Sequence, residues 1–178
     1  LRGFVDRVDA WKQAGQTYYR VVDYKTGRKD FDYCDIFNGL GLQMLLYMFA
    51  LEDNGDALLG EHPIASGVQY FPARVPIVPT DGRPDDREVA AAREKLWKRK
   101  GLILADEMVL NAMESSEMPK RMPYTKKKDG SISGDLADRR QMQLLKGYVF
   151  ALLGKMVDDI SSGSVEANPY TRGGRHNA

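Results

Sequence analysis

The sequence is poor in the residues that build disulfide frameworks and histidine or cysteine metal clusters. Its 178 residues include one cysteine, Cys34, and two histidines. An internal disulfide and a cysteine-only metal cluster are therefore excluded. Apolar runs long enough to cross a bilayer are also missing. The formal net charge is only +1, so the chain as a whole exerts no field on nucleic acid or membrane, and any anionic partner must be held by a local group of charges.

The composition that remains, 43% hydrophobic and 29% charged, is that of a globular domain with one core. The residue pattern predicts strands over 2–8 and 17–24, joined as a hairpin through a loop of several residues. It then predicts a helix over 37–53, a strand over 67–71, helices over 87–110 broken at Gly101, a loop over 119–134 and a long helix opening at Asp135. We expect one α/β domain over residues 1–178, with a small central mixed sheet flanked by helices and a helical C-terminal half.

Three charged residues stand out from this background. Asp6 falls inside the first predicted strand, Asp23 falls at the end of the second, and Lys25 follows two residues later. Side chains alternate along a strand, so Asp23 and Lys25 share a face, and hairpin pairing would bring Asp6 across from them. Paired carboxylates bind hard divalent cations, and a neighbouring ammonium can orient water or stabilise charge on a phosphate. The carbonyl of Tyr24 is a further candidate ligand. On the Asp-x-Lys triplet alone, a surface ion pair at a turn is the favoured interpretation, because such a triplet is common by chance.

The ordered set of motifs goes further than the triplet. It reads Gly3-Phe4-Val5-Asp6, then Asp23-Tyr24-Lys25, then Gln43 with Tyr47 one helical turn later. In this order the sequence resembles the RecB-like branch of the PD-(D/E)xK nucleases, which have a restriction-endonuclease-like core. Within that branch it is most similar to the AddB family of ATP-dependent helicase–deoxyribonuclease subunits, including the stretches at 39–47, 101–107 and 168–170.

The resemblance implies a function and roles for these residues. It implies a Mg²⁺- or Mn²⁺-dependent DNA exonuclease that hydrolyses one strand in double-strand-break repair and recombination. Asp6 and Asp23 would be metal ligands, Lys25 the catalytic lysine, and Gln43 with Tyr47 would position the lysine or the DNA. Asp9 competes for the role of Asp6, but three residues away it would face the opposite side of a regular strand. Arg28 and Lys29, just past Lys25, are weaker candidates for phosphate contacts.

The resemblance also carries expectations about context. It implies a cytoplasmic protein whose partners are DNA and an AddA-type helicase–nuclease subunit. The family has a helix before the first strand and a four-cysteine iron–sulfur site, and neither occurs within these residues. We therefore expect a nuclease core cut from a longer chain, with the cluster only in the full-length protein.

Two other functions stay open at this point. A catalytically silent nuclease fold could bind DNA or act as a scaffold for a partner subunit. A stand-alone RecB-like exonuclease of the Cas4 type would use the same residues. The phosphate-binding loop Gly-x-x-x-x-Gly-Lys-Ser/Thr is missing, so ATP hydrolysis is expected elsewhere in the complex.

Overall fold

A five-stranded mixed sheet forms the centre of the molecule, with strand order β1-β2-β3-β4-β7. The computed structural model describes residues 3–27, 29–74, 77–78, 82, 85–116, 119–167, 169–172 and 175–176. The sheet strands are β1 (Arg7–Gln13), β2 (Gln16–Lys25), β3 (Ile64–Pro72), β4 (Lys100–Leu104) and β7 (Leu136–Ala137). β2 and β3 run parallel, as do β4 and β7, whereas β1–β2 and β3–β4 are antiparallel.

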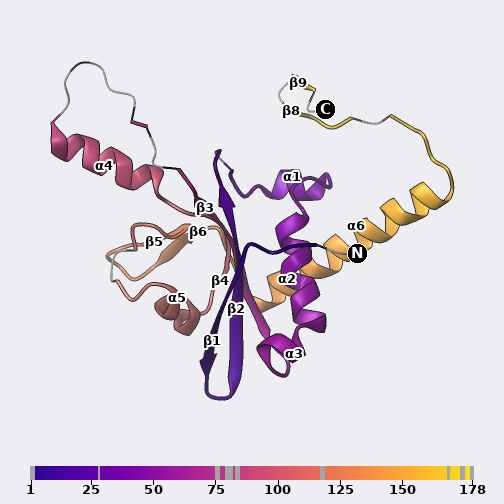
Figure 1. Ribbon diagram of the computed structural model, residues 1–178, viewed down its shortest axis with the longest axis horizontal. Helices are drawn as coiled ribbons and strands as arrows, with labels where there is room; N and C mark the ends of the chain where they lie inside the picture. Colours follow the sequence, from indigo (N-terminus) through magenta and orange to yellow (C-terminus); the bar gives the residue numbers. More distant parts are fainter. Residues whose placement is uncertain are drawn as a thin grey trace.

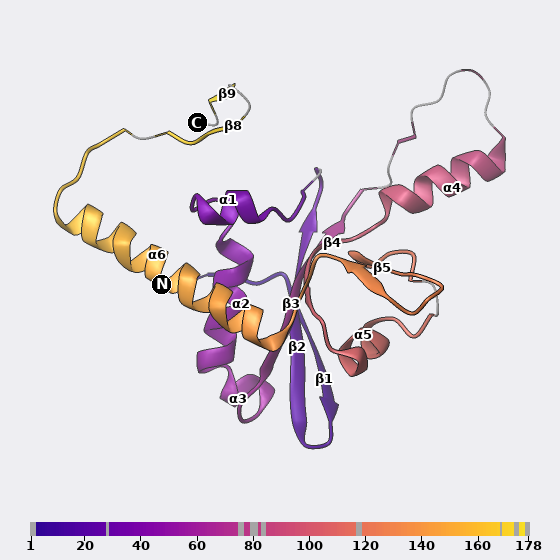
Figure 2. The ribbon, with the colours of Figure 1, turned by 180° about the vertical axis from the view of Figure 1, so that it is seen from behind.

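Helices cover one face of this sheet (Figures 1 and 2). The crossover from β2 to β3 contains α1 (Tyr33–Phe37), α2 (Gln43–Asn54) and α3 (Asp56–Leu59). The long helix α6 (Arg139–Ser161) lies on the same side and runs on past the sheet. Figures 1 and 2 show α5 (Glu107–Met113) and the hairpin of β5 (Tyr124–Lys126) and β6 (Ile132–Gly134) on the other face.

Two elements project from the sandwich. Helix α4 (Asp86–Leu96) extends away from the sheet, and none of its residues is buried (Figure 1). Beyond α6 the chain ends in the short strands β8 (Thr171–Arg172) and β9 (Arg175–His176), which pair with each other. Among the described residues, none of the helices combines the length and apolarity that a membrane crossing requires.

The main core lies between the sheet and α2. Tyr19, Val21 and Val68 of the sheet pack with Met48 and Phe49 of the helix, and all five are almost fully buried. The hydroxyl of Tyr19 donates to the carbonyl of Met48 at 2.5 Å, so its one polar atom is satisfied in the core. Burial of this kind contributes about 1.5–3 kcal/mol per large apolar side chain, which fixes α2 against the end of β2.

The hairpin differs from the sequence prediction. β1 begins at Arg7, not at residue 2, and it continues through the stretch that was expected to be a loop. The turn is only Ala14-Gly15, with φ of 49° and 79°, because Gln13 pairs directly with Gln16. Two residues with positive φ match the twist of paired strands. The sequence does not predict the second half of this strand, because the polar residues Lys12 and Gln13 have a weak β-propensity. Pairing with β2 overrides that propensity.

The second half of the chain holds more strands than predicted. Residues 100–104 form β4 and not helix, and Gly101 lies inside a strand where it does not break a helix. A Cβ at Gly101 would lie 2.0 Å from the Val68 carbonyl oxygen, so only glycine allows β3 and β4 to approach this closely. The predicted loop over 119–134 contains the β5–β6 hairpin, and α6 begins at Arg139 behind the capping residue Asp138, not at Asp135.

Two glycines also delay the helix that was expected over 37–53. Gly39 and Gly41 have φ of 79° and 67°, and these left-handed conformations separate α1 from α2. As a consequence Gln43 is the first residue of α2. The mixed sheet with flanking helices is as predicted, and its individual boundaries are corrected.

Candidate active site

Asp23 and Lys25 form an ion pair at the carboxyl end of β2. They lie two residues apart, so both side chains are on the α2 face of the sheet. The Lys25 Nζ lies 2.6 Å from Oδ2 of Asp23. That oxygen is buried and has no partner in hydrogen-bond geometry, although the ion-pair distance is short. The ammonium thus lies beside this oxygen without the geometry of a hydrogen bond, and the oxygen keeps lone pairs free for another electropositive partner.

Asp6 reaches the same strand end from outside the sheet. It is the residue before β1, so its expected place inside a strand is wrong. The backbone N–H of Tyr24 donates to Oδ2 of Asp6 at 3.1 Å. Since Arg7 pairs with Val22, the chain brings Asp6 level with the Asp23–Tyr24 step. Two carboxylates therefore flank the end of β2, as the sequence predicts.

Asp9, the competing carboxylate, lies elsewhere. It pairs with Arg20 across the hairpin, on the face opposite Asp23. Arg20 donates to Oδ2 of Asp9 from Nε at 2.9 Å and from Nη2 at 2.8 Å, and Nε of Arg7 lies 2.5 Å from Oδ1. Partial burial acts to raise the pKa of Asp9, but the two guanidinium groups outweigh it and hold that pKa below its usual range.

Gln43 and Tyr47 meet the first motif. Nε2 of Gln43 donates to the Tyr47 hydroxyl at 3.0 Å, one turn along α2. A Cβ at Gly3 would lie 2.7 Å from Cε1 of Tyr47, so the backbone at Gly3 passes directly against this ring. The spacing from Gly3 to Asp6 thus has a physical reason. The glycine lets the strand entry pack on α2, and three residues later the chain presents its carboxylate at the end of β2.

Tyr70 is a neighbour that sequence reasoning missed. It pairs with Asp23 in the parallel β2–β3 register, and only 6% of it is exposed. The Lys25 ammonium lies 6.0 Å from the centroid of its ring. Burial, assisted by the Asp23 carboxylate, raises the pKa of Tyr70 to about 12, so its hydroxyl stays protonated at neutral pH. Nothing in the local sequence signals this position, because it depends on the register between distant strands.

The donor set suits a hard cation. Asp6, Asp23 and the Tyr24 carbonyl offer only oxygen, which magnesium and manganese prefer. The unsatisfied buried oxygen of Asp23 is the observation that favours a cation here. In the described part of the chain, however, no group of three or more His, Cys, Asp or Glu side chains is placed to hold a metal ion. The residues therefore fit a partial ligand set of two carboxylates, to which phosphate oxygens or water would add.

The two weaker predicted phosphate contacts differ in what the structure offers. Arg28 lies outside the described residues. Lys29 is described, and its Nζ comes within 3.6 Å of where a Cβ at Gly41 would be, so its side chain turns toward the start of α2. It also lines a groove that reaches Lys25.

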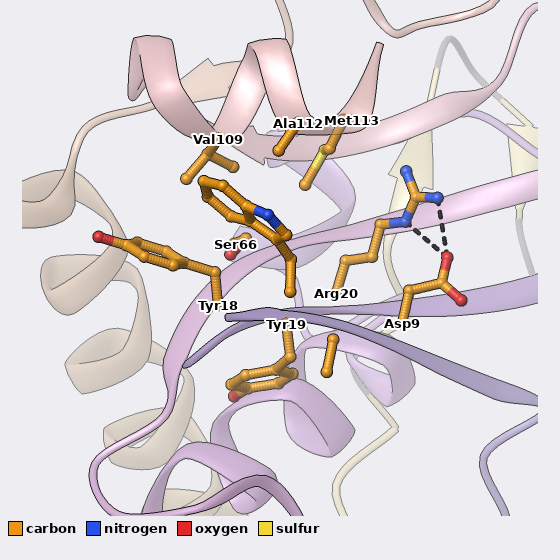
Figure 3. A pocket seen from close by; sticks show the side chains of 10 residues that line it. Asp9, Tyr18, Tyr19, Arg20, Ser66, Val109, Ala112 and Met113 are labelled. Atoms are coloured by element: carbon orange, nitrogen blue, oxygen red, sulfur yellow. Dashed lines mark hydrogen bonds and ion pairs between the residues drawn. The ribbon is translucent and has the colours of Figure 1, made fainter. Parts of the chain in front are cut away.

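A different cavity, of about 270 Å³, lies on the opposite face of the sheet, between the hairpin and α5. Figure 3 shows Tyr18 and Arg20 on the side of the strand that faces Val109 and Met113 of α5, whereas Tyr19 points to the other side. The Trp11 and Tyr18 rings, with centroids 5.5 Å apart, line the cavity, and the Asp9–Arg20 ion pair lies at one end. This cavity includes none of the predicted site residues.

Comparison with known proteins agrees with this geometry. The model of the PD-(D/E)XK nuclease superfamily matches residues 1–175. The chain belongs to that superfamily. Asp6, Asp23 and Lys25 thus lie in a PD-(D/E)XK nuclease domain. The restriction-endonuclease-like core predicted from the sequence is confirmed.

Curated relatives narrow the resemblance within the superfamily. The chain is 39% identical to an ATP-dependent helicase/deoxyribonuclease subunit of Acetivibrio thermocellus, over 98% of this chain and 16% of the relative. It is 36% identical to the proteins of the same name from Clostridium kluyveri and Moorella thermoacetica, over 96% and 97% of this chain and 15% of each relative. This PD-(D/E)XK nuclease domain therefore spans about a sixth of the length of these relatives.

Proposed function

We propose that this chain is a divalent-metal-dependent deoxyribonuclease module that hydrolyses phosphodiester bonds of one DNA strand. One observation carries the proposal. Asp6, Asp23 and Lys25 converge at the end of β2, and one buried carboxylate oxygen there lacks a hydrogen-bond partner. Membership of the PD-(D/E)XK superfamily supports the same function.

The residues would divide the chemistry among them. Asp6, Asp23 and the Tyr24 carbonyl would hold Mg²⁺ or Mn²⁺, which supplies a water of lowered pKa and neutralises charge on the phosphate. The Lys25 ammonium, held beside Asp23 at 2.6 Å, is placed to stabilise negative charge developing on a phosphate oxygen. Gln43 and Tyr47 act as positioning residues, because they brace the segment that carries Asp6.

The relatives' name suggests the setting. Proteins called ATP-dependent helicase/deoxyribonuclease subunits suggest that this domain works in an AddAB-type complex, with DNA as substrate and an AddA-type helicase subunit as partner. Exonuclease mode and a role in double-strand-break repair belong to the same proposal. An iron–sulfur cluster would need ligands beyond this chain, because Cys34 is its only cysteine.

The test is metal binding and cleavage measured together. Isothermal titration of Mg²⁺ and Mn²⁺ into the chain and into Asp23→Ala should give binding that the substitution removes. Cleavage of an end-labelled single-stranded oligonucleotide should need the metal and should disappear in Asp23→Ala and Lys25→Ala. Metal-dependent cleavage that persists in both variants would overturn the site.

A silent nuclease fold is the second candidate, and one observation favours it. Only two carboxylates meet at the site within the described residues, and no third acidic, histidine or cysteine side chain completes a cluster. A silent fold should bind DNA equally well with and without divalent metal and should cleave none. Cleavage that appears on adding Mn²⁺ would exclude it.

A further inference from the structure

A basic groove runs from Lys25 across the carboxyl ends of β2 and β3. It has a volume of about 370 Å³ and lies between the β2–α1 connection, the end of β3 and the junction of α4 with β4. None of its twelve lining residues is acidic. Half of the twelve are cationic, namely Lys25, Lys29, Arg74, Lys95, Lys98 and Lys100. The whole chain has a net charge of only +1, so this groove is a strong local concentration of positive charge.

Nearby acids neutralise only part of this charge. Lys25 pairs with Asp23 at 2.6 Å, and Lys100 pairs with Asp30 at 3.0 Å. Asp135 lies within electrostatic reach of Lys98 and Lys100. Lys29, Arg74, Lys95 and Lys98 themselves form no ion pair with any described residue.

The helix dipole does not account for the set. Lys95 lies in the last turn of α4, where a cation complements the helix C-terminus. Lys29 and Arg74 lie in connections outside any helix, and they come from two other parts of the chain. Like charges brought together from three segments repel one another unless a counter-charge occupies the space between them.

The groove has the size and the position for one nucleic-acid backbone. Its volume equals that of about a dozen waters, which is enough for a sugar–phosphate segment of one strand. One wall contains Lys25, so the groove adjoins the proposed site of cleavage, and a phosphate bound in it would lie next to that site. A point charge on a flexible stem, as lysine provides, contacts phosphate without reading sequence.

We propose that the basic groove holds the phosphates of the DNA strand next to the scissile phosphate, with Lys29, Arg74, Lys95 and Lys98 as its phosphate contacts. This inference rests on the proposed nuclease function and names the surface through which that site takes its substrate. It predicts binding that depends on salt and is indifferent to base sequence.

The experiment measures DNA affinity apart from cleavage. Binding of a fluorescent (dT)₁₅ is followed by anisotropy in EDTA from 0.1 to 1 M salt, for the parent chain and for Lys95→Ala/Lys98→Ala. Loss of two phosphate contacts should flatten the slope of log affinity against log salt by about 1.4. That corresponds to about 25-fold weaker binding at 0.1 M salt, with the two proteins converging near 1 M.

The matched control is Lys12→Ala/Lys155→Ala, which removes the same charge from the hairpin tip and from α6. Circular dichroism checks that both double variants keep the parent's fold, and Lys29→Ala gives an independent single contact with about half the change in slope. An unchanged slope in Lys95→Ala/Lys98→Ala, or an equal change of slope in the control, would overturn the proposal that this groove binds the DNA strand.

A small substrate separates this inference from the nuclease function. Bis(p-nitrophenyl) phosphate has no neighbouring phosphates, so its metal-dependent hydrolysis should stay within about twofold of the parent in Lys95→Ala/Lys98→Ala. DNA cleavage by that variant should recover at saturating DNA. If the parent hydrolyses neither substrate, the proposed function fails, while the salt slope still decides whether the groove binds DNA.

Discussion

The hairpin of β1 and β2 carries two acid–base pairs, one on each face of the sheet, and they differ in how completely they are satisfied. Asp9 receives hydrogen bonds on both carboxylate oxygens, from Arg7 and Arg20. Asp23 faces a single ammonium, and its buried Oδ2 has no hydrogen bond. Arg20 is committed further, because its Nη1 donates to the fully buried Gln69 at 2.7 Å.

We propose that this difference separates a structural pair, Asp9–Arg20, from a functional one, Asp23–Lys25. A carboxylate that accepts hydrogen bonds from two guanidinium groups gains no stability from a metal ion, because its lone pairs are already used. A buried oxygen beside one ammonium is held in a state that a cation would improve, and such a site costs stability until it is filled. The same strand thus supplies a brace on one face and a candidate catalytic group on the other.

Asp23→Asn should give the largest effect on activity. The substitution keeps the shape of the side chain but removes the charge that a divalent cation needs. We expect metal-dependent DNA cleavage to fall by about 1000-fold, which corresponds to about 4 kcal/mol of transition-state stabilisation. The thermal midpoint should stay the same or rise. Asp9→Asn is the matched variant on the other face, and it should cleave at the parent rate; equal loss of activity in both would remove the distinction.

Gly3→Ala should weaken metal binding without touching a ligand. The new methyl group would lie 2.7 Å from the Tyr47 ring, so either the ring or the segment that ends at Asp6 must shift. Overpacking of this kind costs about 1–3 kcal/mol, and we expect Mn²⁺ affinity to drop about tenfold by titration calorimetry. Gly154→Ala in α6 is the control, because outside the backbone of its own helix no atom lies within 4 Å of the added methyl. An unaltered affinity in Gly3→Ala would show that the Gly3 contact does not position Asp6.

Asp9→Asn should be the more damaging of the two aspartate substitutions for stability. It leaves Arg20, whose side chain is only 14% exposed, without its carboxylate. Since Asp9 itself is partly solvated, we expect a loss of about 1–2 kcal/mol in urea unfolding, or about 4 °C in thermal midpoint. Asp158→Asn, on the exposed side of α6, should change neither value. A lower free energy of unfolding in Asp23→Asn than in Asp9→Asn would contradict the assignment of the Asp9 pair as the structural one.

The smallest effect should appear in acid. The pKa of Asp9 is below its ordinary value of 3.8 in the folded chain, so the unfolded chain takes up this proton first as the pH falls. Its contribution to stability is complete above about pH 4 and is lost as the pH falls through the lower folded value. The difference in unfolding free energy between parent and Asp9→Asn should therefore shrink as the pH falls below about 4. A difference that stays constant over that range would assign the stabilisation to packing instead of charge.

The sequence predicted the part of the site that lies along one strand. Asp23 and Lys25 share a face because side chains alternate, and that rule holds without knowledge of the fold. The order of motifs also predicted that Asp6 and the Gln43–Tyr47 turn belong to the same region. The nuclease superfamily and the mixed sheet with flanking helices are confirmed on this basis.

The remainder depended on contacts between distant segments. Tyr70 neighbours Asp23 only through the parallel register of β2 and β3, which no local pattern encodes. Residues 100–104 form a strand where the sequence predicts a helix, because their apolar run has no period of its own and pairing with β3 decides the conformation. The basic groove was equally hidden, since Lys29, Arg74 and Lys98 are far apart in sequence and meet only at the sheet end.

The way in which Asp6 is seated has a consequence for the motion of the site. Residues 3–6 belong to no strand, and they are held by a hydrogen bond from Tyr24, the close approach of Gly3 to Tyr47 and the partial packing of Val5 on the core. A segment secured so lightly opens at a small free-energy cost, while the sheet behind it stays closed. We therefore expect Asp6 to leave its position more readily than Asp23, so the two carboxylates of the proposed site would differ in mobility. A ligand that binds both carboxylates would join residues 3–6 to the sheet, so we expect its binding to slow the opening of this segment more than the opening of the sheet.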